Sequence, residues 1–210
     1  MSKAVDGHNV RLSKALSSTL RHNAEKEGIP IRDDGFVELS DLLAHQKFRN
    51  YTLEDIQQVV AQNDKQRFTL VHVEGAPTGK LDSWLIRANQ GHSLKLDNVQ
   101  MEEITDASRY PMVIHGTYRD KWPSIAFQGL SRMRRNHIHL APGMPGEDGV
   151  ISGMRRSCDV FIHIDMAKAI ADGIPFFISS NSVILTPGKD GYLPSVYFQK
   201  VLTREGSSLL

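Results

Sequence analysis

Four side chains with the chemistry to bind a phosphate group are spread over three segments of this sequence. Arg21 and His22 are neighbours in "STLRHNAEKEGI", Arg87 lies in "LIRANQGHS", and Arg155 follows "SGM". Arginine keeps its charge and presents a fixed fork of donors, so it suits a phosphate. Any one of these residues taken alone is more typical of a solvated surface. The question is whether the predicted elements bring them to an anion-binding site.

The Arg-His pair is expected near the end of an amphipathic helix that stops before Gly28 and Pro30. The apolar face of this helix recurs at three- and four-residue spacing and consists of Leu12, Ala15, Leu16, Thr19 and Leu20. The other side carries Lys14, Ser18, Arg21, His22 and Glu25. Adjacent helix positions point about 100° apart. The pair can therefore straddle a small anion at the edge of the helix, although it could equally be a solvated helix end.

The rest of the first half predicts two more helices and a β-ribbon. "DDGFVELSDLLAH" indicates a turn, a short strand and a helix capped by Ser40, and "TLEDIQQVVAQND" indicates a helix in which Thr52 and Asp55 form a capping box. "RFTLVHV" and "SWLIRANQGHS" are typical of strands. Three helices followed by a two-stranded ribbon is the order of a winged helix. We therefore expect a winged-helix domain over residues 1–95.

Residues 96–110 are polar and acidic, which predicts a linker. A second, mainly β domain is expected over residues 111–210, so the predicted class is α+β. Its strands are expected in "PMVIHGT", "HIHLAP", "DVFIHID", "SVILTPG" and "SVYFQKVL". Helices are expected in "DKWPSIAFQGL" and "DMAKAIADGI".

The sequence gives less support to metal binding, nucleophilic catalysis or phosphoryl transfer from ATP. His137 and His139 lie on one face of a predicted strand and His163 lies in another, but no third convergent ligand is visible, so no metal is expected. Cys158 lies in no catalytic motif, and the sequence contains neither a G-x-S-x-G elbow nor a Walker A loop. The densest basic cluster is "SRMRRN", with Arg132, Arg134 and Arg135. This segment could steer a polyanion or be a solvated loop.

Composition narrows the class of protein. With 25 basic and 24 acidic side chains the net charge is +1, which counts against a strong nonspecific nucleic-acid binder. A single cysteine suits a reducing compartment. No apolar run approaches the roughly 18 residues of a membrane span, and no secretory leader is visible. We expect a cytoplasmic or nuclear protein that does not engage membranes.

Five motifs, in this order, resemble those of the tRNA 2′-phosphotransferases, the KptA-like RNA 2′-phosphotransferase family: "LSKALSSTLRH", "IRANQGHS", "VIHGT", "HIHLAP" and "SGMRRS". The resemblance spans residue 12 to about residue 200. Each motif is weak alone, but five in order are specific. The sequence is most similar to a eukaryotic member of the animal type.

The resemblance implies an N-terminal winged-helix RNA lobe and a C-terminal ADP-ribosyltransferase-like lobe that binds NAD. It implies a transferase that removes the internal 2′-phosphate left at a tRNA splice junction. The phosphate first attacks the nicotinamide-bearing ribose carbon of NAD, which releases nicotinamide and leaves ADP-ribosylated RNA. The neighbouring ribose hydroxyl then attacks the phosphorus, which gives 2′-OH RNA and ADP-ribose 1″,2″-cyclic phosphate. NAD is consumed as a co-substrate and no metal is implied.

The family's catalytic group corresponds to Arg21, His22, Arg87 and the arginine after Ser-Gly-Met, which is Arg155, with the adjacent Arg156 as an alternative. The resemblance implies that the first three bind the 2′-phosphate and that Arg155 stabilises the second transition state. His22 could be an acid or base in that step or only a hydrogen-bonding group.

The resemblance also implies the NAD contacts. His115, Gly116 and Thr117 of "VIHGT" are expected at the NAD riboses and the nicotinamide side. His139 and Leu140 are expected along the NAD pocket. We assign RNA contacts to Lys14, Ser18, Gln90, His92 and Arg134.

Many related transferases place a glutamate on the nicotinamide ribose, and this sequence has none at a comparable position. A phosphate monoester is mostly a dianion at neutral pH, so it needs positioning rather than a general base. The partners expected are NAD and 2′-phosphorylated RNA, and we expect a monomer. Two alternatives stay open: ADP-ribosylation of terminal RNA or DNA phosphates, and a non-catalytic winged-helix module that binds nucleic acid.

Overall fold

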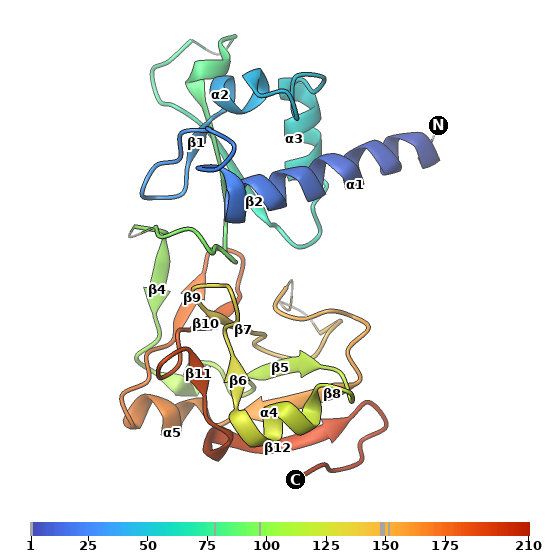
Figure 1. Cartoon of the computed structure of the whole chain (residues 1–210), viewed down its shortest axis with the longest axis vertical. Helices are drawn as coiled ribbons and strands as arrows, with labels where there is room; N and C mark the ends of the chain where they lie inside the picture. The colour runs from blue at the N-terminus through green and yellow to red at the C-terminus, as the bar shows by residue number, and fades with distance from the viewer. Residues whose placement is uncertain (1, 78, 97, 148–149, 151) are drawn as a thin grey trace. The chain divides into compact units, whose positions relative to one another are not determined.

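The computed structural model describes residues 2–77, 79–96, 98–147, 150 and 152–210. The chain divides into two compact units, Met1–Gln100 and Met101–Leu210, each with its own buried core (Figure 1). Helices and several small sheets are both present, which confirms the predicted α+β class. Across the described ranges no helix combines the length and the apolar character that a membrane crossing requires.

The first unit combines helices with a three-stranded sheet. Its helices are α1 (Ser2–Ser18), α2 (Leu39–Ala44) and α3 (Leu53–Ala61), together with the π-helical turn η1 (Thr19–Asn23) and the 3₁₀ turn η2 (Leu81–Ser83). Its strands are β1 (Val37–Glu38), β2 (Phe68–His72) and β3 (Trp84–Ala88). The sheet has the order β1-β3-β2 with antiparallel neighbours, so β3 is central. The predicted ribbon of β2 and β3 is therefore present and gains a third strand.

The core of the first unit follows the predicted helical stripe. Leu12, Leu16 and Leu20 are fully buried, and α1 packs against α3 (Figure 1). Thr52 and Asp55 form the predicted capping box at the start of α3. The predicted cap at Ser40 is wrong, because α2 begins at Leu39 directly after β1 and its N-cap residue is Glu38.

The second unit is mainly β. Its strands are β4 (Met101–Glu103), β5 (Ile114–Thr117), β6 (Leu130–Ser131), β7 (Ile138–Leu140), β8 (Val160–Ile164), β9 (Phe177–Ser179), β10 (Ile184–Thr186), β11 (Tyr192–Leu193) and β12 (Phe198–Thr203). Its helices are α4 (Trp122–Gln128) and α5 (Met166–Ala171), with the 3₁₀ turns η3 (Ala107–Arg109) and η4 (Ser195–Tyr197). The expected strands and both expected helices are present.

The described residues of this unit form three antiparallel sheets, in the orders β4-β9-β10-β7, β12-β8-β5 and β11-β6. Ile114 and Ala141 pair through two backbone hydrogen bonds, which joins β5 to the residue that follows β7. Residues 101–110, in the segment where we expected a linker, form β4 and η3. Strand β4 pairs with β9, so these residues belong to the second unit.

Candidate active site

The Arg-His pair lies in a π-helical turn. Helix α1 ends at Ser18, and η1 continues it with wider hydrogen bonding, in which the Ala24 N–H donates to the Thr19 carbonyl. Arg21 and His22 are the third and fourth residues of η1, and both are partly buried. Single π-helical turns are rare and frequently occur at functional sites. The sequence predicts a helix here, but its apolar spacing does not distinguish an α-helical from a π-helical turn.

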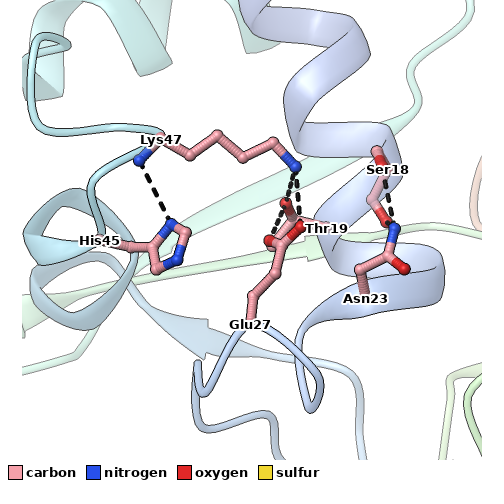
Figure 2. A network of polar contacts seen from close by, with 6 residues as sticks. All are labelled: Ser18, Thr19, Asn23, Glu27, His45 and Lys47. Carbon is pink, nitrogen blue, oxygen red and sulfur yellow. Dashed lines mark hydrogen bonds and ion pairs between the residues drawn. The ribbon is translucent and has the colours of Figure 1, made fainter.

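Polar side chains stabilise this turn (Figure 2). The Asn23 amide donates to the carbonyl and to the hydroxyl of Ser18, at 3.0 Å each. The Thr19 hydroxyl donates to Glu27 at 2.7 Å and accepts from Lys47 at 2.9 Å. Lys47 also donates to Glu27 at 2.9 Å. These contacts connect the end of the turn to the last residue of α1 and its first residue, Thr19, to Glu27 and Lys47.

The chain after β3 forms a fixed loop beside the same turn. Asn89 is buried, its amide donates to the Gln66 carbonyl at 2.7 Å, and its side-chain oxygen accepts from Thr69 at 2.6 Å. Gly91 has a φ of 89°, which favours glycine. A Cβ atom at Gly91 would lie 3.5 Å from Cδ and Nε of Arg21. The loop backbone therefore packs closely against the Arg21 side chain.

Ser93 connects this loop to both members of the pair. Its N–H donates to the Arg21 carbonyl at 2.9 Å, and its hydroxyl oxygen lies 2.9 Å from Nδ1 of His22. The segments "LRH" and "RANQGHS", predicted from separate motifs, therefore meet in the first unit.

Arg87 is the buried cation of this region. It lies on β3, which packs against η1, and only 5% of its surface is exposed. Its Nη2 donates to Gln100 at 2.7 Å, and its guanidinium lies over the Phe36 ring. Its Nε is buried and has no hydrogen-bond partner among the described residues. Burial lowers the pKa of Arg87 and the charge of Asp34 opposes this, but arginine remains protonated in proteins. A buried cation with an unused donor suits an anionic ligand.

The residues expected to contact RNA differ in exposure. Lys14 is exposed, and Ser18 is partly buried and bonded to Asn23. Gln90 and His92 are buried, at 8% and 5% exposure, within the loop that follows β3.

The second unit brings the predicted NAD-binding motifs together. His115 lies on β5, and its Nδ1 donates to the His139 carbonyl at 2.9 Å. A carbonyl only accepts, so the proton of the neutral ring lies on Nδ1, and Nε2 can accept a hydrogen bond. Burial lowers the pKa of His115, the hydrogen bond to His139 opposes this, and the charge of Arg135 adds to it. The neutral form is therefore favoured.

Two glycines allow the motif "SGMR" to approach these strands. A Cβ atom at Gly116 would lie 2.9 Å from Cβ and Sδ of Met154 and 3.0 Å from Sγ of Cys158. A Cβ atom at Gly153 would lie 2.8 Å from the Ala141 side chain. The segment that carries Arg155 consequently packs against β5 and the end of β7.

Sequence reasoning missed Arg135. Its Nη1 donates to Nδ1 of His139 at 3.4 Å, although Arg135 is exposed, as is Arg134, the residue assigned to RNA. Partial burial lowers the pKa of Arg135, and the charge of Arg155 lowers it further, so these two cations are electrostatic neighbours. Arg155 itself is exposed. Arg135 lies two residues before "HIHLA", which could have indicated a contact with that strand. The sequence "MRRN" alone does not show which of its two arginines contacts His139.

Three of the expected NAD residues are buried. Leu140 is fully buried in the core of the second unit, Thr117 is 6% exposed and His139 is 8% exposed. Cys158 is also buried, and burial raises the pKa of its thiol. The described part of the chain contains no cluster of three metal-ligating side chains.

Comparison with known proteins assigns the chain to a family. The profile of the RNA 2′-phosphotransferase, Tpt1 / KptA family matches residues 7–188. The chain is 52% identical over 199 residues to tRNA 2′-phosphotransferase 1 of Danio rerio, covering 93% of this chain and 86% of that protein. It is 52% identical over 196 residues to tRNA 2′-phosphotransferase 1 of Homo sapiens, covering 92% and 76%. It is 39% identical over 209 residues to tRNA 2′-phosphotransferase of Saccharomyces cerevisiae, covering 95% and 86%.

These matches place the chain among enzymes that transfer a phosphate group from RNA. It belongs to the RNA 2′-phosphotransferase, Tpt1 / KptA family, the family that its motifs predict.

Proposed function

We propose that this protein removes an internal 2′-phosphate from spliced tRNA and consumes NAD in doing so. Family membership and the names of its relatives support the substrate class. The observation that carries the chemistry is the meeting of the Arg21–His22 turn with β3 and the loop after it. This arrangement brings the buried Arg87, Arg21 and the imidazole of His22 into the first unit.

The first step forms a bond between an oxygen of the RNA 2′-phosphate and C1″ of the nicotinamide ribose. The C1″–N bond breaks, and its electron pair leaves with nicotinamide. The phosphate is mostly a dianion at neutral pH and needs no base. Arg21, His22 and Arg87 bind this dianion and hold it for attack, which is a positioning effect.

In the second step the ribose 2″ oxygen forms a bond to phosphorus, and the bond between phosphorus and the RNA 2′ oxygen breaks. The proton of the 2″-hydroxyl is lost, and the departing 2′ oxygen gains one. Arg155 stabilises the negative charge on the phosphoryl oxygens. Arg155 rather than Arg156 is assigned to this role, because Arg155 directly follows the Ser-Gly-Met motif.

NAD is assigned to the second unit. The neutral His115 offers Nε2 as an acceptor, and Arg135 and His139 lie beside it. Gly116 and Gly153 keep the "SGMR" segment close to these strands. When bound, NAD supplies the electrophilic ribose carbon and the nicotinamide leaving group.

The two units are proposed to be the lobes that the motifs predict. Helices α1, α2 and α3, followed by the antiparallel strands β2 and β3, have the order of a winged-helix RNA lobe. The mainly β second unit is the ADP-ribosyltransferase-like lobe. The expected boundaries are residues 1–95 and 111–210.

One assay tests the function. The protein is incubated with NAD and an RNA that carries a single internal 2′-phosphate, next to a matched RNA with a 2′-hydroxyl. We expect nicotinamide, 2′-OH RNA and ADP-ribose 1″,2″-cyclic phosphate from the first RNA alone. ADP-ribosylated RNA that persists would point to a transferase that stops after the first step. No nicotinamide release from either RNA would overturn the proposal.

A further inference from the structure

We propose that Ser93 is a positioning residue that orients the Arg21–His22 pair for the reaction. This inference rests on the proposed function, because it assumes that the pair binds the reacting phosphate. Ser93 lies 71 residues beyond His22 in the chain, and its backbone and its side chain each contact a different member of the pair.

The contact between Ser93 and His22 sets the direction of the imidazole. The rotation of a histidine ring about χ2 is broad and weakly restricted, so an isolated ring does not hold one orientation. The 2.9 Å contact between Oγ of Ser93 and Nδ1 of His22 fixes the ring and leaves Nε2 as the nitrogen directed away from Ser93. A hydroxyl both donates and accepts, so this contact fits either protonation state of Nδ1.

The contact between Ser93 and Arg21 fixes the backbone of the turn. The Ser93 N–H donates to the Arg21 carbonyl at 2.9 Å. In a π-helical turn the backbone bonds span five residues, and this inter-segment bond adds a restraint at the residue next to His22. Ser93 thus restrains the Arg21 backbone and the His22 ring together.

The loop that carries Ser93 is itself held in place. Asn89 is bonded to Gln66 and Thr69, and Gly91 lies against the Arg21 guanidinium. Ser93 therefore links the end of the central strand β3 to the Arg-His pair. A surface serine without these contacts would have no such positioning role.

Ser93→Ala removes the ring contact and keeps the backbone bond, so it separates the two effects. A misplacement on the order of 1 Å in a reacting group can cost about a hundredfold in rate. We expect kcat to fall roughly ten- to a hundredfold in Ser93→Ala, with an unchanged KM for NAD, and Ser93→Thr to restore most of the activity because it keeps the hydroxyl.

The matched control is Thr52→Ala, which removes a hydroxyl from the capping box of α3 in the same unit. Loss of a helix cap lowers the stability of the folded protein. Thr52→Ala should lower the melting temperature about as much as Ser93→Ala does and leave kcat unchanged. An equal fall of kcat in both variants would assign the effect of Ser93 to stability and overturn its positioning role.

A double-mutant cycle decides whether Ser93 acts through His22. Groups that act as a unit give strongly non-additive effects. Ser93→Ala should lower kcat in the wild-type background and change it less than twofold in the His22→Ala background. Equal effects in both backgrounds would overturn the proposal.

A spectroscopic measurement tests the contact without activity. The ¹⁵N resonance of Nδ1 of His22 should move in Ser93→Ala and return toward its original position in Ser93→Thr, and an unmoved resonance would overturn the proposal. Full activity of His22→Ala would instead refute the role of His22 in the proposed function. An inactive His22→Ala next to a fully active Ser93→Ala would refute the role of Ser93 alone.

Discussion

The guanidinium carbon of Arg87 lies 4.7 Å from the centre of the Phe36 ring, so an aromatic face covers one side of this buried cation. A planar guanidinium can stack on the ring and still direct donors along its edge, which a lysine ammonium cannot do. One edge donor already serves Gln100. The geometry therefore favours arginine over lysine at this position for more than its charge.

Arg87→Lys should consequently lose most of the activity although it keeps the charge. We expect the rate of nicotinamide release to fall about 10²- to 10³-fold, the usual effect of losing one preorganised donor. Single-turnover assays with 2′-phosphorylated RNA measure this rate. Arg32→Lys, a change of an exposed arginine paired with Asp34, is the control and should have no effect. A fully active Arg87→Lys would show that charge alone suffices.

Arg155→Ala should accumulate ADP-ribosylated RNA more than Arg21→Ala does. Arg155 is assigned to the second step, so its loss leaves the first step largely intact, whereas loss of Arg21 weakens phosphate binding before the first step. Gel separation of labelled RNA over a time course measures the intermediate. Equal loss of nicotinamide release in both variants, with no intermediate, would contradict this division.

The neighbouring Arg156 provides the control for that experiment. It is exposed, and its backbone carbonyl accepts from Arg204. Arg156→Ala leaves this bond in place and should have the wild-type time course. Accumulation of the intermediate in Arg156→Ala instead would move the second-step assignment to Arg156.

Gly91→Ala should impair activity more than its effect on stability explains. A φ of 89° costs a residue with a side chain roughly 1–2 kcal/mol. Relaxation of the loop would then shift the backbone that packs against Arg21. Gly75→Ala is a matched control, because Gly75 has a φ of 77° and open space around it. Both variants should unfold at similarly lowered urea concentrations, and only Gly91→Ala should lose activity. Equal activity of the two variants would contradict a role for the packing of Gly91 against Arg21.

Lys47→Met should lower stability at neutral pH and lose this effect in acid. Burial raises the pKa of Glu27, but hydrogen bonds from Thr19 and Lys47 outweigh it, and the net shift is downward from 4.5. A carboxyl group whose pKa is lower in the folded protein than in the unfolded protein stabilises the fold at pH values above its unfolded-state pKa. This stabilisation is lost as the pH falls through its folded-state pKa. Urea unfolding at several pH values should show a deficit of up to about 1 kcal/mol near neutral pH that shrinks below pH 4.5. A deficit that is constant with pH would contradict the ion pair's role.

Local patterns predicted the elements well. The capping box of Thr52 and Asp55 lies within one helical turn, so the sequence contains both partners of the interaction. The stripe of Leu12, Leu16 and Leu20 likewise needs only helical spacing. Strands β4, β6, β9 and β11 were not predicted, because each is only two or three residues long, and β4, β6 and β11 pair only with strands far along the chain.

The candidate site was predictable as a set of residues but not as a geometry. Motif resemblance selected Arg21, His22 and Arg87, yet the π-helical turn and the Ser93 contacts depend on a tertiary pairing that no local pattern contains. Arg135 was missed for the same reason, since only the fold determines which arginine of "MRRN" contacts His139. The catalytic and NAD assignments stay predictions until ligands are measured.

The π-helical turn also determines which changes of length the chain can tolerate. An α-helix closes its backbone bonds over four residues, and η1 closes them over five, so the segment holds one surplus residue. Deleting Arg21 or His22 would restore an ordinary helix and leave the buried leucines upstream in place. The chain after the deletion would keep nearly the same direction, because only the surplus residue is removed, but the loop at Ser93 would face a turn that lacks one member of the pair. A folded protein without its reaction is therefore one deletion away.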